Sequence, residues 1–173
     1  MVKAARPMVE EIMRNRFNAE VLGIAPYPPQ VVFCKGEVGS LADLEGKNIR
    51  PPNGTMAQMF ASLGAANVQV PAPEMRDALE KGTADMTGSP WGSLFTFGIE
   101  DTVKYHLDTP LYVTVFAFVM NKAKIDSLEP QDREVIDNHC TPEWSEKMAS
   151  GWADGEAAGR QKIIDLGGHT LHK

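Results

Sequence analysis

The hydrophobic pattern of the chain changes period twice within its first 90 residues. Lys3–Glu20 carries apolar side chains at near-helical spacing among charged ones, which predicts an amphipathic helix. Val21–Pro26 and Val31–Lys35 are predicted to be extended, because Tyr27-Pro28-Pro29 prevents a helix between them and β-branched residues favour strand. We interpret this region as a connecting crossover.

Between Gly39 and Thr87 the pattern alternates regularly between strand and helix. A short turn capped by Ser40 precedes the alternation. Single short helices between strands predict right-handed crossovers and a mainly parallel sheet, whose ligands lie beyond the carboxyl ends of the strands. The predicted strands are Asn48–Arg50, Asn67–Val70 and Ala84–Thr87, and the predicted helices are Thr55–Leu63 and Pro73–Lys81.

The second half of the chain becomes helical. A short strand at Lys104–Leu107, a turn at Pro110 and an apolar strand at Val113–Met120 precede helices that begin at Pro130 and Pro142. We therefore predict an α/β fold in three segments. These are a connecting helix and crossover strand (1–34), an α/β ligand-binding lobe (35–115), and a returning strand with C-terminal helices (116–173).

Composition excludes several classes of protein. Hydrophobic residues make up 43% of the 173 residues and charged residues 23%, the balance of a globular chain. The net charge is −6, and no cluster of Lys and Arg could neutralise successive phosphates, so we expect no nucleic-acid partner. No apolar run approaches the roughly 20 residues of a transmembrane helix, and no apolar export signal follows the basic N-terminus.

Motifs for catalysis, cofactors and metals are missing. Gly88-Ser89-Pro90-Trp91-Gly92 puts serine in the wrong place for a nucleophile elbow, and no phosphate-binding glycine loop occurs. His139-Cys140 and His169-x-x-His172 are poorly spaced for metal ligands. We predict no enzyme activity, no cofactor and no metal. Cys34 and Cys140 are interpreted as small core thiols, with a disulfide between them left open.

Two predicted strand-end loops hold the candidate ligand-binding residues. Arg50 ends a strand just before two prolines, and its guanidinium matches a carboxylate with two hydrogen bonds. The pattern alone favours a solvated strand-end arginine or a structural salt bridge over this binding role. Asn53 or Thr55 is expected to cap the next helix. Trp91 fits a core aromatic residue as well as a pocket wall.

The stretch Ser40-Leu-Ala-Asp-Leu-Glu-Gly-Lys-Asn-Ile-Arg50 resembles the solute-binding subunits of TRAP transporters, the DctP-type family. Further segments follow in the family's order over roughly residues 10–170, such as Val70-Pro71, Ala78-Leu79-Glu80-Lys81-Gly82 and Met120-Asn121. The resemblance implies a type II periplasmic-binding-protein fold of two lobes. It also implies that this chain lacks an export signal and a first lobe.

The resemblance also implies roles for individual residues. Arg50 matches the family's carboxylate-clamping arginine, and Asn53 matches a position that contacts ligand in some members. Ser89 stands where several members carry a ligand-binding asparagine, and Lys35 neighbours the position of a second basic residue, which Gly36 matches. The implied ligand-binding set is Arg50, Asn53, Thr87, Ser89, Trp91 and Lys35, with Phe33, Pro73 and Tyr112 as weaker candidates for pocket walls.

Two functions follow as expectations. The first is a periplasmic receptor that binds a small organic acid anion, with one carboxylate or two, and delivers it to the membrane permease subunits of a TRAP transporter. The alternative is the effector-binding domain of a transcription regulator. A chain without its first lobe would expose Val113–Met120, so we also expect a homodimer.

Overall fold

The computed structural model describes residues 2–173, and these form two compact units. The first unit comprises the chain up to Pro28 together with Val113–Asp154. The second unit comprises Pro29–Tyr112 and Gly155–Lys173. The predicted three-segment division grouped the chain differently, because β2 (Gln30–Cys34) pairs with strands of the second unit and the last residues return to that unit.

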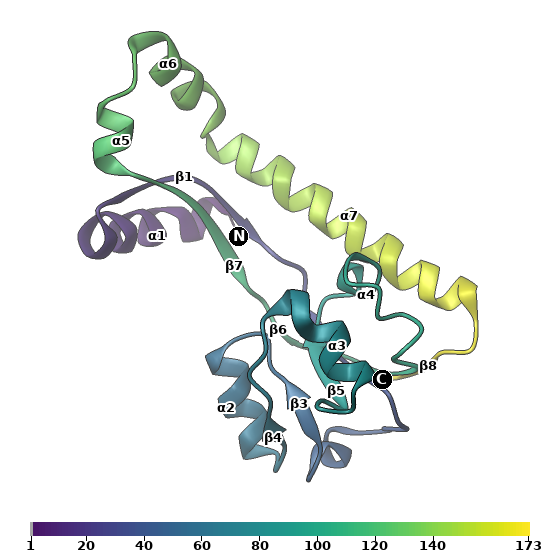
Figure 1. Cartoon of the computed structure of the whole chain (residues 1–173). Helices are drawn as coiled ribbons and strands as arrows, with labels where there is room; N and C mark the ends of the chain where they lie inside the picture. The colour runs from purple at the N-terminus through teal and green to yellow at the C-terminus, as the bar shows by residue number, and fades with distance from the viewer. Residues whose placement is uncertain (1) are drawn as a thin grey trace. The chain divides into compact units, whose positions relative to one another are not determined.

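A six-stranded sheet forms the centre of the second unit, in the order β4-β3-β5-β2-β6-β8 (Figure 1). β2 is antiparallel to both of its neighbours, whereas the other pairings are parallel. Five strands therefore run in one direction and β2 alone is reversed, which confirms the predicted α/β class with a mainly parallel sheet. The other strands are β3 (Asn48–Arg50), β4 (Ala66–Asn67), β5 (Met86–Ser89), β6 (Tyr105–Tyr112) and β8 (Thr170–His172).

Helices bury both faces of this sheet. Alternate residues of β2 point into different cores, with Phe33 in one and Val32 and Cys34 in the other. The Phe33 core takes residues of α3, α4 and the end of α7, and the other core takes residues of η1 and α2. The bounds are η1 (Leu41–Leu44), α2 (Gly54–Ser62), η2 (Ala72–Glu74), α3 (Met75–Glu80), α4 (Gly92–Thr96) and α7 (Pro142–Leu166).

One predicted turn is wrong, because β6 runs straight through Pro110. β8 pairs with β6 only as far as Leu107, so Pro110 lies beyond the reach of that neighbour. The missing N–H of proline breaks no hydrogen bond at an unpaired edge. Proline is therefore tolerated in this strand.

The first unit is built on a ribbon of two antiparallel strands, β1 (Ala19–Pro26) and β7 (Val115–Asn121). α1 (Val2–Phe17) ends three residues before the predicted bound, because Asn18 adopts a φ of 48° and turns the chain into β1. The remaining helices are α5 (Lys122–Asp126), α6 (Pro130–His139) and the first part of α7. Within residues 2–173, no helix is long and apolar enough to cross a membrane.

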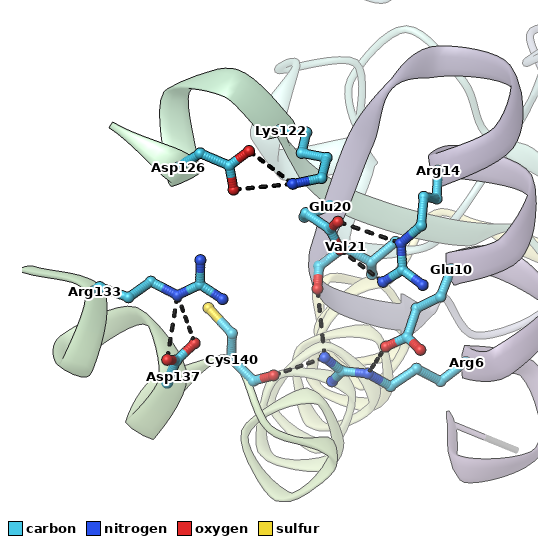
Figure 2. A network of polar contacts seen from close by, with 10 residues as sticks. All are labelled: Arg6, Glu10, Arg14, Glu20, Val21, Lys122, Asp126, Arg133, Asp137 and Cys140. Atoms are coloured by element: carbon cyan, nitrogen blue, oxygen red, sulfur yellow. Dashed lines mark hydrogen bonds and ion pairs between the residues drawn. The ribbon is translucent and has the colours of Figure 1, made fainter. Parts of the chain in front are cut away.

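A polar network holds the elements of the first unit together (Figure 2). The Arg6 guanidinium on α1 donates to the Cys140 carbonyl at 2.7 Å, to the Val21 carbonyl at 3.4 Å and to the Glu10 carboxylate at 2.6 Å. Arg14 binds Glu20 through two hydrogen bonds of 3.2 and 2.8 Å. These contacts join α1 to β1 and to the end of α6, in a unit whose fully apolar core is small.

The two strands of the ribbon differ in exposure. Val21 and Ile24 of β1 are buried, whereas the large apolar side chains of β7 are 42–45% exposed on both faces of the strand. The expected exposure of the apolar returning strand is therefore confirmed. The exposed residues of β7 are Val115, Phe116, Phe118 and Val119.

Candidate ligand-binding site

Arg50 is a buried cation at the carboxyl end of β3. Arg50 is only 8% exposed, and its Nε atom donates to the Val70 carbonyl at 3.2 Å. Within residues 2–173, the structure gives Arg50 no ion pair and its two terminal nitrogens no hydrogen-bond partner. Burial lowers the pKa of Arg50, because the charged form loses solvation. An anion at this guanidinium would restore that lost stabilisation.

The reversed direction of β2 brings four polar side chains to the same edge of the sheet. β3, β5 and β6 end there with Arg50, Ser89 and Tyr112, and β2 begins there with Gln30. The register confirms this, because Thr87 pairs with Arg50, Val31 with Ser89, and Gln30 with Tyr112. We call this the ligand edge of the sheet.

Two of these residues are tied to each other. The Tyr112 hydroxyl donates to the Gln30 side-chain oxygen, and Gln30 is only 5% exposed. Sequence reasoning missed Gln30, because it looked only at the carboxyl ends of strands. The signal that could have found it is Pro28-Pro29, which marks the point where the chain enters the sheet.

A shallow pocket of about 400 Å³ lies next to Arg50. It is lined by Arg50, the loop Pro51–Gly54 at the start of α2, and the segment Gln69–Pro71. The Asn53 side-chain oxygen accepts from the Met56 N–H at 3.0 Å, so Asn53 caps α2 as expected and Thr55 does not. The pocket therefore combines a guanidinium with a helix N-terminus, and both favour an anion.

Thr87 and Trp91 lie in the interior rather than on the pocket surface. Thr87 is fully buried, and its hydroxyl lies 3.3 Å from the Arg50 carbonyl, to which it donates. Trp91 is 5% exposed and packs edge-on against Phe33 and His106, with ring centroids 5.1 and 5.2 Å away. Neither residue lines the Arg50 pocket.

Lys35 lies at the opposite edge of the sheet. It follows the carboxyl end of β2, where its N–H donates to the Asp85 carbonyl just before β5 begins. Its amino group donates to the Leu79 carbonyl at 2.6 Å. The structure therefore does not bring Lys35 together with Arg50, because the strand that carries it is the reversed one.

The three weaker candidates for pocket walls lie in different parts of the second unit. Phe33 is fully buried in the core, and Pro73 is exposed in η2 outside the lining of the Arg50 pocket. Tyr112 alone reaches the ligand edge.

The potential metal ligands and the two thiols were also located in the described part of the chain. No group of three potential metal ligands occurs among residues 2–173. Cys34 and Cys140 are both free thiols, and burial raises the pKa of Cys34 to about 12.

Comparisons with known proteins agree with this geometry. The sequence model of the family described as "Bacterial extracellular solute-binding protein, family 7" (DctP) matches residues 29–173. The chain belongs to this family. The resemblance seen in the sequence is thereby confirmed for most of this DctP-family chain.

Solved structures of TRAP solute-binding proteins share the fold. One from Rhodoferax ferrireducens, in complex with benzoate, is 30% identical, with a TM-score of 0.82 over 94% of this chain and 54% of its own. One from a marine metagenome, in complex with metahydroxyphenylacetate, is 29% identical, with a TM-score of 0.85 over 99% of this chain and 57% of its own. A Bordetella pertussis receptor that binds pyroglutamic acid is 21% identical, with a TM-score of 0.88 over 98% of this chain and 56% of its own. The chain thus spans just over half the length of these proteins.

Proposed function

We propose that this DctP-family chain is the part of a TRAP solute receptor that holds the carboxylate of an organic acid. Arg50 carries the proposal, because it is a buried cation for which residues 2–173 provide no counter-ion. A buried charge without a partner is costly, and a ligand carboxylate removes that cost. The relatives solved with benzoate, metahydroxyphenylacetate and pyroglutamic acid support an organic acid as the ligand.

The proposed binding mode uses the geometry of the pocket. The Val70 carbonyl fixes Nε of Arg50, so the terminal nitrogens can donate side by side to the two oxygens of one carboxylate. The backbone N–H groups of Gly54 and Thr55, at the start of α2, add partial positive charge. Ser89 adds a hydroxyl on the neighbouring strand. No acid–base or nucleophilic step is required, so the function is binding.

The partners of the whole protein follow from the family. We propose that the ligand is captured in the periplasm and passed to the membrane permease subunits of a TRAP transporter. The matched family consists of extracellular solute-binding proteins, which supports this location. None of the comparisons supports the alternative of a regulator's effector domain.

Calorimetric titration of the chain with a panel of organic acids tests the proposal. We expect Arg50→Ala to weaken binding by at least about thirtyfold, since removing one partner of a buried charge pair costs about 2–5 kcal/mol. Arg50→Lys should recover part of the loss, because it restores the charge without the planar fork. Arg16→Ala, an exposed arginine on α1, is the matched control and should bind normally. Normal affinity in Arg50→Ala would refute the assignment.

We also propose that the chain by itself forms a homodimer through β7. Within residues 2–173 this strand pairs only with β1, so its other edge is unpaired, and exposed apolar side chains stand on both of its faces. Two such edges can pair across a twofold axis. Light scattering should give a dimer mass at micromolar concentration, and Phe118→Lys should give a monomer. A monomer for the unmodified chain would contradict the proposal.

A further inference from the structure

β8 is a short strand at the outer edge of the six-stranded sheet. Within residues 2–173 it pairs only with β6, in parallel and over three residues. The two residues that join α7 to this segment are Gly167 and Gly168, which adopt left-handed φ angles of 69° and 70° with open space around them. Glycine adopts many backbone conformations, so this pair can serve as a hinge. We call residues 167–172 the strap.

A pair of hydrogen-bonded histidines ties the strap to the interior of the sheet. Nδ1 of His169, in the strap, lies 2.9 Å from Nε2 of His106, which is fully buried on β6. The Lys104 ammonium lies 3.5 Å from the other ring nitrogen of His169. Because an ammonium can only donate, Nε2 of His169 accepts and its Nδ1–H donates to His106. The single hydrogen of the His106 ring is therefore on Nδ1.

Two ring nitrogens along this pairing have no partner. Nδ1 of His106 and Nε2 of His172 are both buried, and the described part of the chain offers neither of them a hydrogen bond. A buried polar atom without a partner is costly, because it has lost water and gained nothing in exchange. Release of the strap would admit water to both rings. The docked strap is therefore held less firmly than the packing of Leu171 on the Phe33 core would suggest.

We propose that the strap is a pH-sensitive device. In mild acid the two hydrogen-bonded histidines take up protons, and residues 167–172 detach from β6 while the rest of the sheet stays folded. The hinge, the short edge strand and the buried histidine pair carry this inference. It is independent of Arg50 and of the proposed ligand.

Burial keeps the His106 ring neutral while the strap is docked. Phe33 of β2 and Trp91 enclose the ring edge-on and are uncharged. Lost solvation, together with the nearby His169 and Lys104, lowers the pKa of His106 from 6.5 to about 3. A proton can therefore reach this ring near neutral pH only when the strap is open.

His169 is affected by charges of both signs. Lost solvation and Lys104 lower its pKa, Asp101 and Glu100 raise it, and the first two prevail. A proton on Nε2 of His169 would also turn the acceptor of the Lys104 ammonium into a second donor, so that contact would be lost. The other charged groups on the packed elements are Arg160 of α7, which lies over the Trp91 ring and pairs with Asp108, and Asp43 of η1, which interacts with His172.

The direction of these shifts sets the response to pH. A ring whose pKa is lower in the docked state binds protons better in the open state, so docking is strongest above about pH 6.5 and weakens as the pH falls. With a pKa of 6.5 when open and about 3 when docked, His106 alone raises the open fraction about tenfold between pH 7.5 and pH 5.5. Proton uptake by His169 adds to this change.

Hydrogen exchange of the chain, followed by NMR at pH 7.5 and pH 5.5 with and without dilute urea, tests the inference. The reporter is the Thr170 N–H, which donates to the Lys104 carbonyl at 2.9 Å, and the reference amides are those of β2 in the middle of the sheet. After correction for the intrinsic exchange rate, Thr170 should be less protected than β2, and its exchange should not respond to urea. Its protection should fall at least about tenfold on acidification.

Two results would overturn the inference. Equal protection and an equal urea response at Thr170 and β2 would mean that the strap opens only when the whole unit unfolds. Protection of Thr170 that does not change between the two pH values would mean that no histidine controls its release.

Variants test the hinge and the histidines separately. His169→Ala removes the bond to His106 at a partly exposed position, so Thr170 should lose about fivefold in protection at pH 7.5. Gly168→Ala should lower protection about fivefold or more at both pH values, because the strained φ is relieved on release. His106→Gln should lose most of the pH dependence, whereas the exposed His139→Gln should keep all of it. Unchanged protection in His169→Ala, or a full tenfold fall in His106→Gln, would refute the role of the pair.

Discussion

Acid should destabilise the second unit through His106, a histidine buried in its centre. His106 is fully buried between Phe33 and Trp91, with Nε2 2.9 Å from Nδ1 of His169, and one hydrogen is shared between the two nitrogens. Lost solvation, together with nearby His169 and Lys104, lowers the pKa of His106 from 6.5 to about 3. The folded state therefore holds this ring neutral.

The pH dependence follows from the direction of that shift. In the unfolded chain His106 takes up a proton below about pH 6.5, whereas in the folded chain it does so only near pH 3. Its contribution to stability is thus complete above pH 6.5 and is lost as the pH falls from 6.5 toward 3. The slope approaches about 1.4 kcal/mol per pH unit, which amounts to about 2 kcal/mol at pH 5 relative to pH 8.

Urea unfolding followed by circular dichroism between pH 8 and pH 5 measures this loss. The matched variant is His106→Gln, which keeps a polar side chain of similar length but does not titrate. The difference in free energy of unfolding between the two proteins should shrink by about 2 kcal/mol from pH 8 to pH 5, since only the parent chain takes up the extra proton. A difference that stays constant with pH would refute the reasoning, as would an NMR titration in which the His106 ring protonates near pH 6.5 in the folded state.

Two further substitutions test the packing of the second unit. Both carboxylate oxygens of Glu156 lie 3.0 Å from the Gly92 N–H at the start of α4, so Glu156→Ala should lower the free energy of unfolding by about 1–3 kcal/mol, whereas Glu156→Gln, which keeps one acceptor, should lose less. Equal losses in urea melts would contradict the role of this contact. Gly64→Ala should destabilise by about 1–3 kcal/mol, because Gly64 has a φ of 81° and a new Cβ would lie 2.9 Å from the Glu45 side chain. The control Gly36→Ala, with open space around it, should change stability by no more than about 0.5 kcal/mol, and a similar loss at both glycines would exclude the proposed strain.

The sequence predicted the elements of this fold better than their pairing. Helix starts at Pro130 and Pro142 and the strand ending at Arg50 were all found, because capping residues, prolines and hydrophobic period act locally. β4 is only two residues long, against four predicted, since the apolar residues after Asn67 continue as loop. Local signals carry no information about which strand lies beside which.

The candidate site was predicted less well, because strand pairing decides which side chains lie near Arg50. Arg50 and Asn53 were predicted together because they lie at the end of one strand and just after it, and both line one pocket. Lys35 was grouped with them only through the family resemblance, as a neighbour of the position that Gly36 matches, and it lies at the opposite edge of the sheet. Gln30 was missed because only the carboxyl ends of strands were considered, and it begins the one reversed strand. The reversal of β2 follows from its pairing with β5 and β6, which lie far along the sequence. A pattern read along the chain does not reveal that direction.

The place of β2 in the sheet also sets the order in which the second unit can form. This five-residue apolar strand precedes both of its neighbours in the sequence, and they begin only at Met86 and Tyr105. The last strand, which pairs with β6, starts only at Thr170, at the very end of the chain. Until β5 and β6 exist, Val31, Val32 and Phe33 have no strand to pair with, and loops of this length close slowly. During synthesis, the apolar side chains of β2 therefore stay without their sheet neighbours until β5 and β6 have been made.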